Sequence, residues 1–163
     1  MKMRKNRSRG GFTLVEMLCT IVVLLLLSGL LATGVRLGVF SFRKSVMASE
    51  SQVLCTTLRT VVSDELRYAG KITTGNDTIK FFSQNYGDGA TFSTNEDGQV
   101  VIEADEGASK LLSSRAYPYG MKASVKISSY DSTTRIFKAS VTVTDSSGKT
   151  LASSDFEVEK LNE

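Results

Sequence analysis

Residues 9–18 read RGGFTLVEML, and residues 19–35 continue as CTIVVLLLLSGLLATGV. Residues 17–35 contain no charged side chain, and about 20 apolar residues are enough for a helix to cross a bilayer. One carboxylate, Glu16, stands at the start of this run, although an ionised side chain at the centre of a membrane costs about 2.5–3.5 kcal/mol. Glu16 therefore either lies near the membrane surface or has a partner.

The charge of the chain is unevenly distributed. The net charge is +3, but five basic residues precede the apolar run: Lys2, Arg4, Lys5, Arg7 and Arg9. Beyond Gly11 the chain holds 15 basic and 17 acidic residues, so the remainder is mildly acidic and has no general nucleic-acid footprint. A basic flank before an apolar run is typical of a cytoplasmic N-terminus. This orientation predicts that the C-terminal domain is carried to the opposite side of the membrane.

The pattern after the apolar run predicts one long helix. Apolar residues recur at helical spacing through residues 39–69, no proline occurs before Pro118, and Gly70 is the first strong stop signal. We expect a single helix over residues 12–69, about 87 Å long, of which only the first part fits inside a membrane. Gly29, Gly34 and Gly38 are the positions where this helix is most easily bent.

Beyond Gly70 the apolar period changes from 3.6 to 2. Short strands are predicted at residues 78–83, 90–94 and 99–104, and three alternating segments near 121–128, 137–143 and 151–158 predict an antiparallel meander with one buried face. The second half of the helix is its natural cover. The expected fold is α+β, with residues 1–11 as a leader, 12–36 as a transmembrane helix, 37–69 as its amphipathic continuation and 70–163 as a β-rich domain.

Three interpretations of the N-terminus remain open at the level of the residues. A secretory signal peptide with a cleavage site near residues 32–34 is disfavoured, because its apolar segment spans about 7–15 residues and this one is longer. A plain single-pass anchor would hold Glu16 close to the cytoplasmic surface, where it stays hydrated. The third interpretation is that Glu16 has a partner.

Residues 4–36 resemble the class III leader of type IV prepilins and of the pseudopilins of type II secretion and competence machines. The basic leader ends in Gly10-Gly11, and Phe12-Thr13-Leu14-Val15-Glu16 leads directly into the apolar span. The resemblance implies that a membrane-embedded prepilin peptidase cuts between Gly11 and Phe12 and N-methylates Phe12. It also implies that Glu16 pairs with the new amine of a neighbouring subunit and so sets the register of assembly.

The resemblance therefore predicts a structural subunit. Its expected partners are the peptidase, other pilin or pseudopilin subunits, an assembly platform and, before assembly, the lipid bilayer. The expected location is the cell membrane, with the N-terminus cytoplasmic, and then an extracellular pilus or pseudopilus. The alternative is a membrane-anchored extracellular binding or sensor protein that does not polymerise.

Two features depart from the family pattern. Thr33 and Gly34 occupy the region where many type IV pilins carry a helix-kinking proline, and the pair of C-terminal cysteines that closes a loop in many pilins is missing. Cys19 and Cys55 would lie about 54 Å apart on one helix, so we expect no bridge between them within the chain. The missing cysteine pair favours a Gram-positive or pseudopilin-like member, and together with the moderate length of the chain it favours a minor pilin or a pseudopilin.

Little in the sequence predicts catalysis or cofactor binding. The chain has no histidine, and no nucleophile has a recognisable base, so we expect no enzyme activity and no cofactor. Asp88, Asn95 and Asp97 are weak candidates for calcium ligands, because their spacing does not match an EF-hand and such loops are commonly plain turns.

Overall fold

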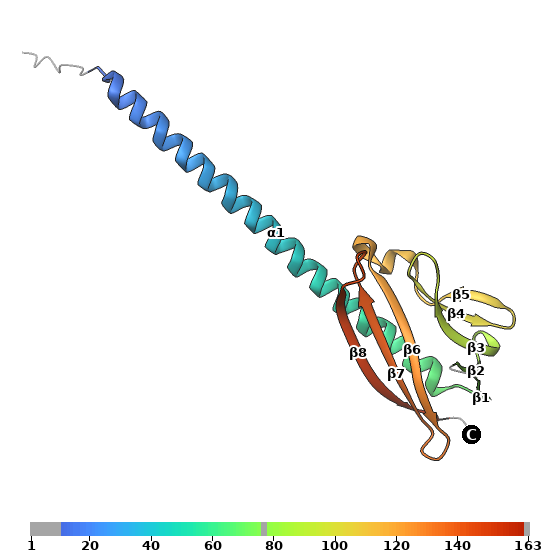
Figure 1. Cartoon of the computed structure of the whole chain (residues 1–163). Coiled ribbons are helices and arrows are strands. Elements are labelled where there is room, and N and C mark those ends of the chain that lie inside the picture. Colours follow the sequence, from blue (N-terminus) through green and yellow to red (C-terminus); the bar gives the residue numbers. More distant parts are fainter. Residues whose placement is uncertain (1–10, 76–77, 162–163) are drawn as a thin grey trace, which may run out of the picture. The chain divides into compact units, whose positions relative to one another are not determined.

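A long helix is followed by two antiparallel sheets (Figure 1). The computed structural model describes residues 11–75 and 78–161. The chain divides into two units, Met1–Lys44 and Ser45–Glu163, which are considered separately below. Together they form an α+β, pilin-like fold, as the sequence predicts.

Helix α1 (Leu14–Arg67) begins and ends two residues inside the predicted limits. At its start, the Thr13 hydroxyl accepts the Glu16 backbone N–H at 3.3 Å, so Thr13 lies outside the helix as its cap. At its end, the Ala69 N–H bonds to the Leu66 carbonyl three residues earlier, which tightens the last turn. The helix is continuous through Gly29, Gly34 and Gly38.

The first sheet has five strands in the order β1-β2-β3-β4-β5, all antiparallel. These strands are β1 (Ile72–Thr74), β2 (Ile79–Ser83), β3 (Gly87–Thr94), β4 (Val100–Ala104) and β5 (Gly107–Lys110). Strands β2, β3 and β4 match the predicted segments. Strands β1 and β5 were not predicted, because each is short and largely exposed and therefore shows no alternation of apolar residues.

The second sheet is the predicted meander. It consists of β6 (Lys122–Asp131), β7 (Ile136–Thr144) and β8 (Thr150–Glu159), paired antiparallel in sequence order. Two single-turn 3-10 helices, η1 (Ser114–Ala116) and η2 (Pro118–Gly120), lead from β5 into β6. The Ala123 N–H donates to the Gly98 carbonyl at 2.8 Å and joins the second sheet to the first.

One hydrophobic core holds the unit Ser45–Glu163 together. Within this unit, Leu58, Val62 and Leu66 of α1 are fully buried against side chains of both sheets. The sheets contribute mainly the alternating residues Phe81, Val100, Ile102, Ala123, Phe137, Val141, Val143 and Val158. The Arg59 guanidinium also lies 5.5 Å from the centre of the Phe156 ring, so a cation–π contact adds to the helix–sheet packing.

Candidate processing and assembly site

The predicted cleavage site lies just before the first turn of α1. Gly11 and Phe12 are exposed and outside the helix, and Phe12 retains 73% of its accessible surface. A Cβ placed on Gly11 would meet no atom within 4 Å in the chain. Any demand for glycine at this position must therefore come from an outside partner such as a protease, which needs a close approach to the backbone.

Glu16 has a local structural role that the sequence analysis missed. Residues 13–16 read TLVE, and a Thr-x-x-Glu sequence at a helix start is the signature of a capping box. Its first bond, from the Glu16 N–H to the Thr13 hydroxyl, is present. A carboxylate in the first turn also interacts favourably with the helix dipole. The capping bond uses the backbone N–H of Glu16 and needs no particular side chain, so the helix dipole gives the local reason for a glutamate at this position.

The carboxylate of Glu16 is not used within the chain. Among the described residues it takes part in no ion pair, and its side chain makes no hydrogen bond. Phe12 and Glu16 are four residues apart, which is about one helical turn. Thr13 thus caps the helix through the backbone N–H of Glu16, while the Glu16 carboxylate remains available to a partner outside the chain.

The first half of α1 presents apolar side chains to its surroundings. Leu14, Leu25, Leu30 and Leu31 each keep at least 68% of their surface exposed, and no residue of the apolar window is buried within the described structure. By length and composition, this helix is suitable for crossing a membrane.

The polar hydroxyls of the apolar run are satisfied inside the helix. Thr20, Ser28 and Thr33 each donate a hydrogen bond to the carbonyl four residues earlier, at 2.7–2.9 Å. Such bonds remove the main cost of placing hydroxyls in a hydrocarbon environment or in a bundle of apolar helices. The serine and threonine residues are therefore compatible with either setting.

The weak calcium candidates lie at the two ends of one strand. Asp88 lies at the start of β3, whereas Asn95 and Asp97 lie in the turn after it. The Asn95 side-chain oxygen accepts the Gln99 N–H at 2.8 Å, which is ordinary turn chemistry. Over residues 11–75 and 78–161, no three acidic, cysteine or histidine side chains lie close enough together to hold a metal ion.

Both cysteines are free thiols. Cys19 is exposed on the apolar part of α1, and Cys55 is buried, with its thiol 3.9 Å from the Val141 carbonyl. Burial raises the pKa of the Cys55 thiol, and the nearby Arg59 partly offsets this effect. A buried thiol with a raised pKa is a packing residue rather than a nucleophile.

Comparison with known proteins supports the interpretation of the N-terminus. Residues 6–32 match the prokaryotic N-terminal methylation motif, a stretch that contains Gly11, Phe12 and Glu16. No curated protein and no solved structure matches the chain. The match supports a class III leader of the prepilin type at the N-terminus of this chain. Residues 6–10 of the match lie outside the described residues.

The motif has several general implications. It implies processing by a prepilin peptidase and association with other pilins, and it favours a structural pilin over an enzyme. Together with the apolar helix, it indicates membrane anchoring.

Proposed function

We propose that this chain is a structural subunit of a type IV pilus or pseudopilus. In this proposal a prepilin peptidase cuts after Gly11 and methylates the amine of Phe12, and the mature chain assembles through its N-terminal helix. The methylation motif over residues 6–32 carries the proposal. The segments are 1–11 as leader, 12–36 as transmembrane and assembly helix, 37–69 as its continuation and 70–163 as the β-rich domain.

The exposed apolar surface of α1 supports an assembled state. Lipid covers this surface before assembly, with the N-terminus on the cytoplasmic side where the basic leader favours it. In a filament the same side chains pack against other copies of α1. Because lipid and helix surfaces are similarly apolar, close packing and specific polar pairs decide whether helices associate.

The pair between Phe12 and Glu16 supplies such a specific interaction. Cleavage creates an ammonium group at Phe12, and a neighbouring copy displaced along the helix axis by about one turn brings this amine level with Glu16. In an apolar bundle, removing one partner of a buried ion pair costs about 3–5 kcal/mol. The pair therefore fixes the axial register, as a single polar residue does in a coiled coil.

N-terminal mass spectrometry of the chain, co-expressed in membranes with a prepilin peptidase, tests the processing step. The expected product begins at a methylated Phe12. An intact Met1 or a start at Val35 would overturn the proposal. Gly11→Ala should be processed better than Gly11→Leu, because a larger side chain blocks close approach to the scissile bond. Normal processing of Gly11→Leu would contradict this role for Gly11.

Two variants separate the register role of Glu16 from its capping role. Glu16→Gln removes the charge but keeps a side chain that suits a capping box, whereas Thr13→Ala removes the cap and keeps the charge. We expect both variants to be cleaved, and only Glu16→Gln to enter filaments poorly when mixed with the unmodified chain. The register role is wrong if Thr13→Ala shows the same defect or Glu16→Gln shows none.

A specific observation favours a second candidate function. Glu16 lies in the first turn of α1, where a carboxylate interacts favourably with the helix dipole, and this gives it a reason to be present in a chain that never polymerises. A single-pass, membrane-anchored binding or sensor protein would keep the anchor and the β-rich domain but form no filament. This alternative predicts that the chain stays monomeric in membranes even after its leader has been cut.

A further inference from the structure

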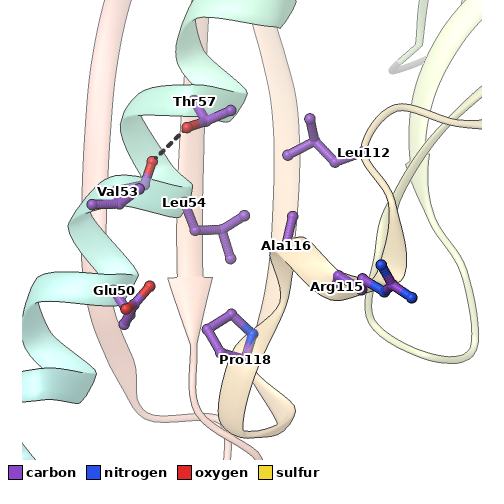
Figure 2. A pocket seen from close by; sticks show the side chains of 8 residues that line it. All are labelled: Glu50, Val53, Leu54, Thr57, Leu112, Arg115, Ala116 and Pro118. Carbon is purple, nitrogen blue, oxygen red and sulfur yellow. Dashed lines mark hydrogen bonds between the residues drawn. The ribbon is translucent and has the colours of Figure 1, made fainter.

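A small groove lies at the start of the unit Ser45–Glu163, between α1 and the segment that connects β5 to β6 (Figure 2). Its volume is about 210 Å³, and it is lined by Glu50, Val53, Leu54, Thr57, Leu112, Arg115, Ala116 and Pro118. Val53 is an aliphatic residue that is 59% exposed, whereas its neighbour Leu54 is buried. An apolar cavity of about 150 Å³ can hold a benzene ring, so this groove has room for one aromatic side chain.

The groove carries one unpaired acidic group at its rim. Glu50 lines the groove on α1 and Pro118 lines it on the opposite side, while Arg115 points away from α1 (Figure 2). The only ion pair among the described residues joins Lys138 to Glu157, so Glu50 has no cationic partner there. An occupant that suits the groove therefore combines an aromatic ring with an adjacent positive charge.

The chain itself presents a surface with this chemistry. Phe40 is 69% exposed on α1, and Arg36, Arg43 and Lys44 are its neighbours at positions i−4, i+3 and i+4, on the same side of the helix. We call these four residues the Phe40 patch. None of its three cations forms an ion pair within the described residues. The nearby Phe42 is equally exposed at 70%, but it lies on a different side of the helix.

A membrane surface is the other environment that would suit the Phe40 patch. Phe40 lies about 39 Å of helix beyond Leu14, the first residue of α1, and this length exceeds the hydrocarbon thickness of about 30 Å. Aromatic and basic side chains are common at this depth, where they meet lipid headgroups. Lipid, however, leaves the groove empty and Glu50 unpaired, whereas a second copy satisfies both surfaces with one contact.

We infer that the groove of one copy receives the Phe40 patch of a second copy. Phe40 enters between Leu54 and Ala116, and Arg36 of the same copy lies against Glu50, because Arg36 and Glu50 are 14 residues apart on α1, as Phe40 and Leu54 are. Phe40 and Leu54 are 14 residues apart on α1, so two parallel copies meet in this way at an axial displacement of about 21 Å. This contact rests on the proposed function, and it involves a different neighbour from the Phe12–Glu16 pair, whose copies are displaced by only about one turn.

Disulfide cross-linking in assembled filaments tests the contact. In a Cys19→Ser background, one copy carries Phe40→Cys and another carries Ala116→Cys; Cys55 is buried and stays in place. We expect an oxidised dimer that forms only in filaments, because the two Cβ atoms must come within about 4.5 Å. Phe42→Cys with Ala116→Cys is the matched control and should cross-link at most about a tenth as much.

Charge reversal tests the role of Glu50. Glu50→Lys should lower the yield of the dimer to about a tenth, since like charges brought together are strongly unfavourable. A copy that carries Arg36→Glu should restore it when paired with Glu50→Lys. Asp64→Lys, another exposed position on α1, is the control and should leave the yield unchanged.

The outcomes distinguish the contact from the proposed function. Filaments that form normally but show equal cross-linking from residues 40 and 42, or none, overturn the contact alone. Loss of membrane retention in the Arg36→Glu copy, with no effect of Glu50→Lys, assigns the Phe40 patch to lipid and also overturns the contact. A correctly processed, unmodified chain that forms no filament overturns both proposals.

Discussion

Removal of the Glu65 carboxylate should loosen the first sheet from α1. One carboxylate oxygen accepts the Ser83 hydroxyl at 2.7 Å, and the other accepts the Asn85 side-chain amide at 2.6 Å. Ser83 is 1% exposed at the end of β2, and its oxygen also accepts the backbone N–H groups of Asn85 and Tyr86. These contacts, which we call the Glu65 clasp, tie the helix to the β2–β3 turn.

The expected cost of Glu65→Ala is about 2 kcal/mol. A hydrogen bond to a charged group contributes about 1.5–3 kcal/mol when it is shielded from water, and the bond from the exposed Asn85 contributes less. The buried Ser83 hydroxyl loses its acceptor, but its oxygen keeps both of its N–H donors. Glu65→Gln retains one acceptor oxygen and should cost about half as much. Asp64→Ala, at the adjacent exposed position, should cost less than about 0.5 kcal/mol.

Urea unfolding of the full chain in detergent, followed by near-UV circular dichroism, measures these costs. All five tyrosines lie beyond residue 45 and the chain has no tryptophan, so the tyrosine signal reports the unit Ser45–Glu163. At a slope of about 2 kcal/mol per molar urea, Glu65→Ala should lower the midpoint by about 1 M. The reasoning is refuted if Asp64→Ala has the same effect, or if the Glu65→Ala midpoint does not move.

Three further predictions follow from single positions. Hydrogen bonds from the Ser147 hydroxyl and from backbone N–H groups lower the pKa of Asp145. The contribution of Asp145 to stability is therefore present above about pH 4 and is lost as the pH falls through the depressed pKa. Asp145→Asn should make the urea midpoint less dependent on pH over this acid range. Cys55, buried and with a raised pKa, should resist iodoacetamide at pH 7 until urea unfolds the unit, and rapid labelling of the native protein would contradict this placement. Gly98→Ala should destabilise the unit Ser45–Glu163 by more than about 1 kcal/mol in the same assay, because Gly98 has a φ of +75° and a Cβ there would overlap the Lys122 side chain. Gly148→Ala is the control: Gly148 has a similarly strained φ but no overlap, so this substitution should cost less.

The long helix and the meander were predictable because both have a strong apolar period. The spacing of Leu54, Leu58 and Val62 follows one face of a helix, and the alternation of Phe137, Ala139 and Val141 follows one face of a strand. Strands β1 and β5 could not be predicted, because they have no such apolar period. Exposed edge strands form by hydrogen bonding to a neighbouring strand, and this pairing does not require alternating apolar residues.

The candidate site was predictable only in part. Gly11, Phe12 and Glu16 form a contiguous motif that can be found without a fold. The Thr-x-x-Glu signature of a capping box at residues 13–16 was also predictable from the sequence. The groove near Glu50 could not be predicted, because it joins α1 to residues 112–118, and apolar periodicity does not show which loop packs against which helix face.

The two roles of Glu16 use different atoms and are therefore compatible. The cap uses the backbone N–H of Glu16, which already bonds to Thr13, whereas the proposed register pair uses the carboxylate, which no cation in the described chain neutralises. Cleavage after Gly11 leaves Thr13 in place, so the start of the helix can persist while a new amine appears one residue before the cap. In the proposed assembly, cutting the leader thus changes the partner available to Glu16 without requiring α1 to refold.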